Sequence, residues 1–312
     1  MLGIQYPIFA GAMAHVSDPD LVSAVSNAGG LGILATGGDT AEQVKEKVEA
    51  TFSKTEQPFA VNLYLLNPNI EEVVEYLMES GVKIITTGAG TPKRYIPKFK
   101  EKGIKVIPVV PSVRIAKKME ESGADAVIVE GMEAGGHIGK STTMTLIPQV
   151  VDALHIPVIA AGGIADSRGM AAAIMLGAEA VQIGTRFIVA KESNVHPAFK
   201  EKILNAGDTE TVITGNILGH SVRLIRNQLT TDFIEKEKAL LIQNSKDLSE
   251  LNMVADGSLQ RAVFEGDTIY GSLMAGQIAG LVRKEETSEE IILDIMEDLQ
   301  STISNKLTYF NQ

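Results

Sequence analysis

One histidine, His137, stands in a glycine-rich segment directly after a run of apolar, β-branched residues. The segment 131–140 reads GMEAGGHIGK and follows the strand-like run AVIV at 126–129. Glycines allow a backbone to approach a flat ligand closely, and an imidazole can exchange a proton near neutral pH. The segment also fits a solvated loop, so the role of His137 depends on the elements around it.

Glycines and polar residues also end most of the other apolar runs. Gly162-Gly163 after the seventh run and Gly184-Thr185 after the eighth can offer backbone N–H groups to a phosphate. The sequence therefore predicts a phosphorylated ligand. The residues at these predicted strand ends are Gly11, Ala12 and Met13 (first run), Asn62 (third), Glu130 (sixth), Gly162 and Gly163 (seventh), and Gln182, Gly184 and Thr185 (eighth).

The elements that must position these residues recur along the chain at a spacing of roughly 25 residues, each an apolar run followed by a helical pattern. Eight such units predict a (β/α)8 TIM barrel, whose active site lies at the carboxyl ends of its strands. A doubly wound open sheet is the alternative. The runs begin near Pro7, Gly30, Phe59, Val82, Lys105, Ala126, Pro157 and Ala180, and glycines that suit helix C-caps stand at 29, 81, 103, 123 and 177.

The segment 193–267 interrupts this period, because it is charged, helical in pattern and too long for an ordinary connection. We interpret it as a small helical lid inserted after strand eight, with residues 1–192 and 268–312 forming the barrel domain. A helical outgrowth or a subunit contact fits its composition equally well. A capping box at 287–290 then predicts a final helix that packs on the body or on a partner subunit.

Composition excludes several classes of function. The 312 residues include no cysteine, so redox chemistry must come from a bound cofactor. A net charge of −11 disfavours nucleic acid as a partner. The sequence shows no basic leader and no apolar run long enough to span a bilayer, and we expect a cytoplasmic protein. The scattered histidines lack carboxylates at ligand spacing, so no metal site is predicted.

The segments 6–186 and 271–280 resemble the FMN-dependent enoyl-acyl-carrier-protein reductase II family. The broader superfamily contains the nitronate monooxygenases, which also carry a histidine in an Ala-Gly-Gly-His loop. The longer string EGMEAGGHIGK at 130–140, with TTM at 142–144 and AKES at 190–193, resembles the reductase branch more closely.

This resemblance implies an FMN cofactor whose phosphate lies on the glycine loops after strands seven and eight, with the flavin ring against the first strand end. Two departures are visible: the first motif reads Gly-Ala-Met rather than Gly-Gly-Met, and His15 follows it in place of an aromatic residue. The implied cofactor contacts are Gly162, Gly163, Gly184 and Thr185 for the phosphate, Gly11, Ala12, Met13, Asn62, Glu130 and Gln182 around the ring, and Met274 and Gln277 from the C-terminal segment.

The implied reaction passes a hydride from NADH or NADPH through FMN to the β-carbon of a 2-enoyl thioester on acyl carrier protein. His137 is then the candidate donor, which either protonates carbon or polarises the thioester carbonyl. In a nitronate monooxygenase, which uses FMN and oxygen, His137 acts instead as a base. A flavin-free phosphate-binding barrel is a third possibility. The resemblance also implies a homodimer and stimulation by a monovalent cation.

Other basic residues are ambiguous at this stage. His155 and His196 fit structural positions, whereas His15 and His220 stand close enough to predicted loops to contact substrate or cofactor. A basic group near the lid is the candidate docking patch for an acidic carrier protein, although it also fits a solvated face. This group comprises Lys191, Lys200, Lys202, Arg223 and Arg226.

Overall fold

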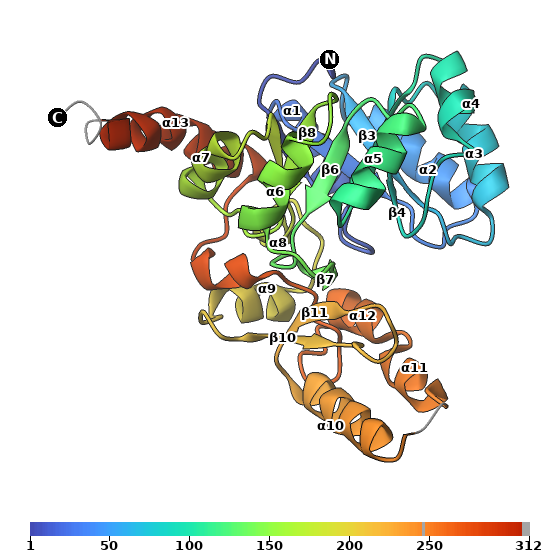
Figure 1. Ribbon diagram of the computed structural model, residues 1–312, viewed down its shortest axis with the longest axis vertical. Coiled ribbons are helices and arrows are strands. Elements are labelled where there is room, and N and C mark those ends of the chain that lie inside the picture. Colours follow the sequence, from blue (N-terminus) through green and yellow to red (C-terminus); the bar gives the residue numbers. More distant parts are fainter. Residues whose placement is uncertain (245–246, 308–312) are drawn as a thin grey trace.

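The computed structural model describes residues 1–244 and 247–307, which form a barrel and a smaller lid below it (Figure 1). Parallel strands close the barrel in the order β1-β2-β3-β4-β5-β6-β8-β9, and β9 pairs back onto β1. This closure confirms the TIM barrel and rules out the open sheet. The strands are β1 (Ile8–Ala10), β2 (Leu31–Ala35), β3 (Phe59–Tyr64), β4 (Ile84–Gly88), β5 (Lys105–Val110), β6 (Val127–Glu130), β8 (Val158–Ala161) and β9 (Ala180–Ile183).

The helices that surround the barrel begin and end where the sequence signals stand. The Asp18 carboxylate accepts hydrogen bonds from the first turn of α1, and Thr40 forms a capping box with Gln43. The five predicted C-cap glycines all have φ between +70° and +99°. The helices are α1 (Pro19–Asn27), α2 (Ala41–Phe52), α3 (Ile70–Glu79), α4 (Ile96–Glu101), α5 (Val113–Glu121), α6 (Thr143–Val151), α7 (Ser167–Met175) and α8 (Thr185–Ile188).

The barrel strands are mostly apolar because both of their faces are largely buried. In β6, Ile128 belongs to the cluster inside the barrel, whereas Val127 and Val129 belong to the cluster between strands and helices. Leu2 and Ile4 pack against the inner cluster, so the start of the chain contributes to this core. The interior is therefore a packed core that leaves only the carboxyl ends of the strands open to a ligand.

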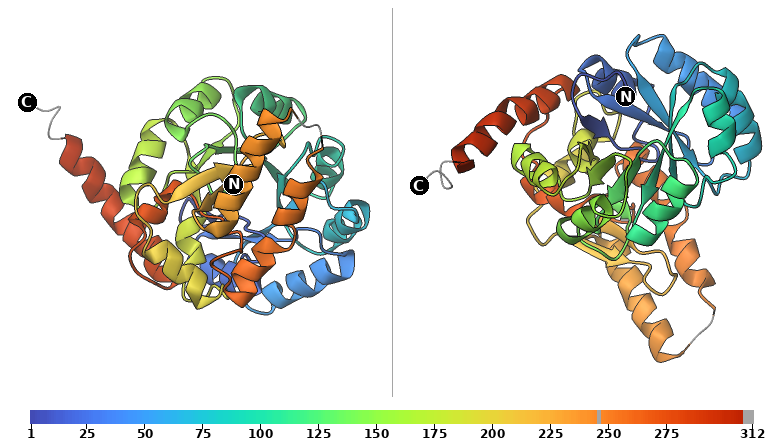
Figure 2. Two further views of the ribbon diagram at one scale, coloured as in Figure 1. Left: turned by 90° about the horizontal axis from the view of Figure 1, so that it is seen from below. Right: turned by 45° about the horizontal axis from the view of Figure 1, so that its top comes forward.

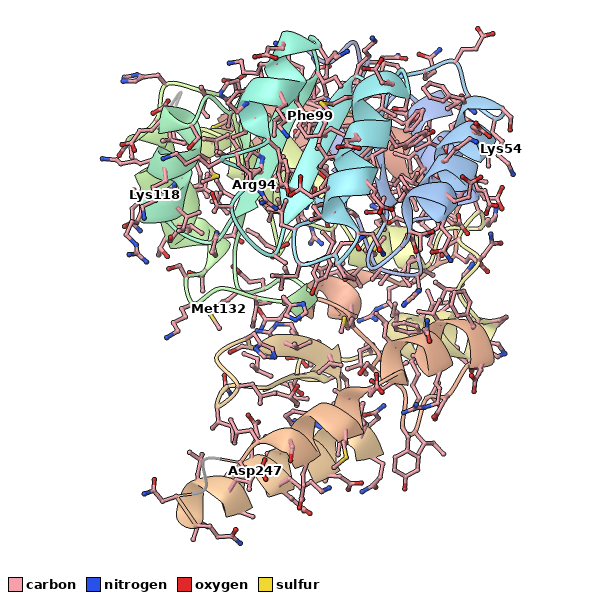
Figure 3. The ribbon with its side chains drawn as sticks, turned by 90° about the vertical axis from the view of Figure 1, so that its right-hand side faces the viewer. Lys54, Arg94, Phe99, Lys118, Met132 and Asp247 are labelled. Carbon is pink, nitrogen blue, oxygen red and sulfur yellow. The ribbon has the colours of Figure 1, made fainter. Side chains whose placement is uncertain are left out.

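The lid contains strands as well as the expected helices. β10 (Thr211–Thr214) and β11 (Val222–Ile225) form an antiparallel sheet with β7 (Gly136–His137), which lies in the loop after β6. In Figure 3, Met132 lies at the boundary between barrel and lid, and Asp247 lies at the far end of the lid. The helices of the lid are α9 (Pro197–Leu204), α10 (Gln228–Ile242), α11 (Ser249–Ala255), α12 (Ser258–Gln260) and the π-helix η1 (Arg261–Glu265).

The C-terminal segment returns from the lid to the barrel. A 3-10 helix, η2 (Gln277–Leu281), leads to α13 (Ser288–Leu307), which packs on α7 and extends beyond the barrel (Figure 2). The capping box is confirmed, since Thr287 and Glu290 exchange backbone-to-side-chain hydrogen bonds. The buried Arg186 of α8 bonds Glu286 and Asp294 of this segment. Within residues 1–244 and 247–307, no helix combines the length and apolar character needed to cross a membrane.

Candidate active site

A layer of polar side chains caps the apolar interior of the barrel. Side chains alternate along a strand, so Asn62, Glu130 and Gln182 point the same way as Ala60, Ile128 and Ala180, which lie inside the barrel. Thr86 is hydrogen-bonded to Asn62 across the β3–β4 pair, with 2.9 Å between Nδ2 and Oγ1. Three of the predicted site residues therefore meet at the open end of the barrel.

The Glu130 carboxyl is the most perturbed acid of this layer. Burial raises the pKa of Glu130 to about 7, and its side chain makes no hydrogen bond to any described residue. Glu130 is half-buried, and its carboxyl is free to hydrogen-bond a ligand at the open end of the barrel. A polar ring system with N–H and carbonyl groups at its edge, such as a flavin, fits this layer.

The first predicted motif borders the same layer. Ser17, which the sequence analysis did not select, fixes its backbone by donating to the Gly11 carbonyl at 3.0 Å and accepting from the Met13 N–H at 2.9 Å. A Cβ at Gly11 would lie 3.2 Å from the Gln182 side chain. The Ala12 methyl packs against the barrel interior. The methyl group that Ala12 adds to the Gly-Ala-Met motif therefore packs on the protein interior.

The predicted phosphate loops also adjoin the rest of the site. Gly162 and Gly163 have φ of +90° and +76°, a region that favours glycine. The Met13 sulfur would lie 3.5 Å from a Cβ at Gly184, and the Thr185 hydroxyl accepts the Gly276 N–H at 2.8 Å. These loops and the first motif thus form one continuous rim, and its side-chain-free turns suit a phosphate group.

The glycines around His137 mainly allow backbone to pack on backbone. A Cβ at Gly135 would lie 2.6 Å from the Ala275 carbonyl carbon, and one at Gly276 would lie 2.7 Å from the Glu133 carbonyl oxygen. The Gln277 N–H donates to that same oxygen at 2.9 Å. The expectation that these glycines serve ligand approach is therefore corrected for Gly135, which accommodates the C-terminal segment containing Met274 and Gln277.

Two charged side chains, those of Glu133 and Arg223, fix the His137 loop in place by hydrogen bonds. The sequence did not predict this role for either residue. Both carboxylate oxygens of Glu133 accept the Thr143 N–H at the start of α6, at 2.9 and 3.0 Å. The Arg223 guanidinium donates twice to the Met132 carbonyl and once to Thr211. Burial lowers the pKa of Arg223, and the Glu133 charge opposes this shift.

The predicted basic patch is therefore wrong for two of its five members. Arg223 is buried in the loop contacts, and the buried Lys200 donates to the Ala190 carbonyl and to Glu285. Lys191 is exposed and pairs with Glu290 at 3.3 Å. Lys202 and Arg226 are exposed. Proximity in the sequence did not reveal that Lys200 and Arg223 are buried and bind groups inside the fold.

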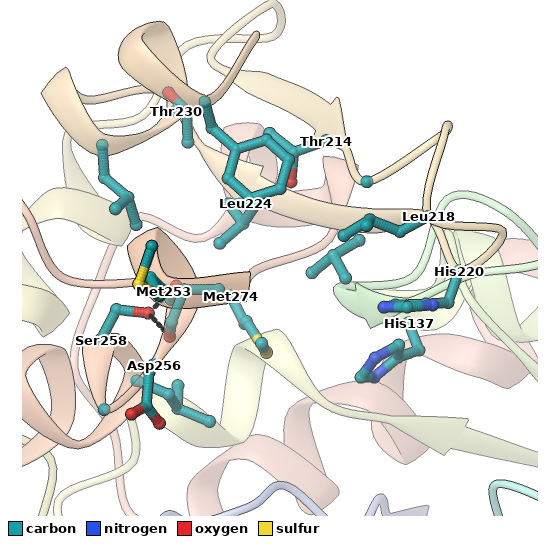
Figure 4. A pocket seen from close by; sticks show the side chains of 18 residues that line it. His137, Thr214, Leu218, His220, Leu224, Thr230, Met253, Asp256, Ser258 and Met274 are labelled. Atoms are coloured by element: carbon teal, nitrogen blue, oxygen red, sulfur yellow. Dashed lines mark hydrogen bonds between the residues drawn. The ribbon is translucent and has the colours of Figure 1, made fainter. Parts of the chain in front are cut away.

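His137 lies on β7 and faces a second histidine. Its ring centroid is 6.0 Å from that of His220, and Figure 4 shows the two rings side by side. Neither imidazole makes a hydrogen bond to any part of the chain that the structure describes. Desolvation first, and the neighbouring His220 second, lower the pKa of His137. The lowered pKa favours the neutral imidazole of His137, which can donate from one nitrogen and accept at the other.

Both histidines line a mainly apolar pocket of about 540 Å³, which is formed by lid residues, by His137 of the loop after β6 and by Ser272 and Met274 of the C-terminal segment. In Figure 4 they lie at one side of it, and Met253, Ser258 and Asp256 lie at the other. The Ser258 and Ser272 hydroxyls are 2.6 Å apart near that far side. The apolar lining consists of Leu218, Val222, Leu224, Leu229, Phe233, Met253, Leu259 and Met274.

The remaining histidines take other positions. His15, with φ of +63°, lies edge-on to Phe264 of the lid at 5.7 Å between centroids. His196 accepts the Ala198 N–H as the N-cap of α9, which confirms its structural role. His155 lies in the turn before β8, at the opposite end of that strand from the polar layer.

Comparison with known proteins gives a consistent result over nearly the whole chain. Residues 1–298 match the sequence model of the nitronate monooxygenase family. The (3aS,4S,5R,7aS)-5-hydroxy-7a-methyl-1-oxo-octahydro-1H-indene-4-carboxyl-CoA dehydrogenase of Mycobacterium tuberculosis is 33% identical, over 96% of each chain.

Among solved structures, FabK from Thermotoga maritima superposes with a TM-score of 0.94 and 45% identity, covering 99% of this chain and 97% of FabK. A nitroalkane oxidase from Streptomyces ansochromogenes superposes with a TM-score of 0.85 and 25% identity, covering 97% of this chain and 98% of the oxidase. On this likeness, and on a barrel mouth that fits a flavin, the chain belongs to the nitronate monooxygenase family and is an FMN-dependent oxidoreductase.

Proposed function

We propose that this protein is an enoyl-[acyl-carrier-protein] reductase that uses NADH or NADPH and FMN to reduce the double bond of 2-enoyl thioesters. The observation that carries the proposal is the apolar pocket with His137 at its barrel side. A pocket of this size and character suits an acyl chain. The 45% identity with FabK, an enoyl-acyl-carrier-protein reductase II, supports the same reaction.

The barrel rim holds the cofactor in this proposal. Gly162, Gly163, Gly184 and Thr185 would bind its phosphate through the backbone N–H groups of their turns. Bound FMN would supply the hydride transfer to the substrate. The polar layer and the first motif, formed by Gly11, Ala12, Met13, Asn62, Glu130 and Gln182, would hold the flavin ring. Met274 and the backbone of Gln277 border this space from the C-terminal segment.

His137 handles the charge that develops on the substrate. Hydride addition at the β-carbon makes an enolate, which needs a hydrogen-bond donor at oxygen and a proton at the α-carbon. A neutral imidazole at the barrel side of the pocket can supply an N–H to either atom. The apolar lining excludes water from the acyl chain and strengthens that hydrogen bond.

The thioester is carried by acyl carrier protein in this proposal, and the exposed Lys202 and Arg226 are its candidate contacts near the lid. We further propose a homodimer and a response to monovalent cations, in line with the sequence resemblance. Each is testable by sedimentation and by assay in potassium, sodium or Tris buffers.

A second candidate is nitronate oxidation, favoured by the matching family model and the nitroalkane oxidase structure. A neutral His137 can also accept the α-proton of a nitroalkane. The two functions differ in their oxidant, since only the monooxygenase requires O₂. They also differ in their need for a nicotinamide.

The deciding experiment follows NADH and NADPH oxidation by the FMN-loaded protein without oxygen. Addition of a medium-chain 2-enoyl thioester starts rapid turnover if the proposal is right. His137→Gln abolishes that turnover, whereas the matched control His155→Gln retains it. Failure of the enoyl thioester with both nucleotides, together with oxygen-dependent consumption of an alkyl nitronate, would establish the second candidate instead.

A further inference from the structure

We propose that His220 is a proton relay that delivers a proton from solvent to His137 in each catalytic cycle. This inference rests on the proposed reductase function, because enoyl reduction consumes one proton per turnover. It assigns a positioning and relay role to a lid residue outside the barrel.

The backbone holds the two histidines in one register. β7 pairs with β11 so that His137 lies opposite Val222, and the Ile138 N–H donates to the Ser221 carbonyl at 3.0 Å. His220 precedes Val222 by two residues, so its side chain points to the same face of this sheet as that of Val222. Diagonal neighbours on one face of an antiparallel pair lie within reach of ring side chains. The 6.0 Å between the ring centroids follows from this register.

The separation suits proton transfer better than a fixed contact. The rings are tilted by 42° and share no direct hydrogen bond in the part of the chain that the structure describes. One water between the rings can complete a hydrogen-bonded path. Since no carboxylate among the described residues bonds either imidazole, both nitrogens of each ring stay available for transfer.

Both histidines are exposed in the protein without ligands. His220 follows Gly219, an exposed glycine with φ of +79°. His137 lies on the barrel side, where cofactor and thioester would cover it during reduction. A proton taken from His137 must then be replaced from the lid side, where His220 stands.

The proton balance assigns one step to each ring. The α-carbon forms a C–H bond as the N–H bond of one His137 nitrogen breaks. The other His137 nitrogen takes a proton from the His220 imidazolium, and neutral His220 then takes one from solvent. Hydride and proton together saturate the double bond, and His137 never becomes an anion.

Few other charges face this pair. Asp256 is the one carboxylate among the described residues that line the pocket, and it lies on the far side from the histidines (Figure 4). Glu133 is bound to Thr143, and the Arg223 guanidinium is bound to Met132 and Thr211. Lys140 and Glu130 belong to the same loop and its preceding strand. Desolvation first, and the charge of the neighbouring His220 second, lower the pKa of His137.

The test separates the two half-reactions of the FMN-loaded protein by rapid mixing without oxygen. In His220→Gln, flavin reduction by NADH or NADPH keeps the wild-type rate, because that step takes no proton from His137. Reoxidation by the enoyl thioester slows about tenfold or more, as expected for the loss of a proton-transfer group. His155→Gln, a control at the opposite end of the barrel, leaves both rates unchanged. In His220→Ala, added imidazole restores reoxidation.

A second readout is the titration of His137 followed by NMR. Its pKa rises in His220→Gln because the neighbouring charge is gone. Unchanged reoxidation and an unchanged His137 titration in His220→Gln would overturn the relay, and so would equal slowing of both half-reactions. A wild-type enzyme whose reduced flavin ignores enoyl thioesters would instead refute the proposed function, and the relay with it.

Discussion

The barrel and the lid meet at His137 but are built by different rules. The barrel strands are mostly apolar and buried on both faces, and a polar layer that includes Asn62, Glu130 and Gln182 lies at their carboxyl ends. In the lid, a three-stranded sheet and several helices surround a pocket. We therefore propose that the barrel holds the cofactor and that the lid determines which substrate binds.

The largest expected effect comes from disrupting the contact between the His137 loop and the C-terminal segment, which we call the seam. Gly135→Ala places a methyl group 2.6 Å from the Ala275 carbonyl carbon, so the His137 loop and the C-terminal segment must separate. We expect enoyl reduction to fall by about 100-fold or more, since displacement of a catalytic group by ~1 Å has such effects.

Gly38→Ala is the matched control, because a Cβ there meets no atom within 4 Å and the variant should keep full activity. Both variants are compared by steady-state rate and by circular dichroism. Equal activity in the two variants would show that the close packing at Gly135 does not position His137.

Alanine substitutions of two buried phenylalanines, one in each region, should have different effects on substrate preference. Phe99 lies in the barrel core and Phe233 lines the lid pocket. Truncation of either to alanine should cost about 3–5 kcal/mol of unfolding free energy where the site is fully packed. Only Phe233→Ala should also alter the preference between short and long acyl thioesters, measured as the ratio of kcat/KM values. A shifted ratio in Phe99→Ala would contradict the division of roles.

Glu130 gives the barrel mouth a distinct pH dependence. Its folded pKa of about 7 exceeds the ordinary value of 4.5, so the folded state binds the proton more tightly. Stability in the absence of FMN should therefore fall as pH rises from about 4.5 to 7, by roughly 3 kcal/mol in all. Glu130→Gln should remove this loss, so it is more stable than wild type at pH 8 and equal to it at pH 4. The unfolding free energy of both proteins is measured with urea between pH 4 and 8. The same pH dependence in wild type and Glu130→Gln would exclude a raised pKa of Glu130.

The smallest effect is expected on the lid surface. Arg226→Glu should raise KM for the carrier-bound substrate a few-fold and leave KM for a soluble thioester unchanged, because exposed charges contribute mainly to encounter. Lys98→Glu, in α4 on the barrel, provides an exposed control of equal charge change. Equal KM changes for both substrates would remove Arg226 from the docking surface.

The same contrast explains how much could be predicted from the sequence. The barrel repeats one pattern, so its strands, its C-cap glycines and its polar ends such as Asn62 follow from local periodicity. The lid strands β10 and β11 span four residues each, in a segment whose charges favoured a helical interpretation. The pairing of β11 with β7 joins residues about 85 positions apart, which no local pattern reveals.

Several site contacts were missed for a related reason. Glu133, Ser17 and Arg223 act on backbone groups that only the fold brings near them. In the sequence they are indistinguishable from surface polar residues. His220 was identified as a possible contact, but its place beside His137 depends on the β7–β11 register.

The division of labour between barrel and lid is tested most directly by rapid mixing of the reduced, FMN-loaded protein with a 2-enoyl thioester in the absence of oxygen. The account predicts fast flavin reoxidation in wild type and a loss of about 100-fold or more in His137→Gln, with flavin reduction by NADH or NADPH unchanged in both. Equally fast reoxidation in His137→Gln would contradict the central role given to the histidine at the seam.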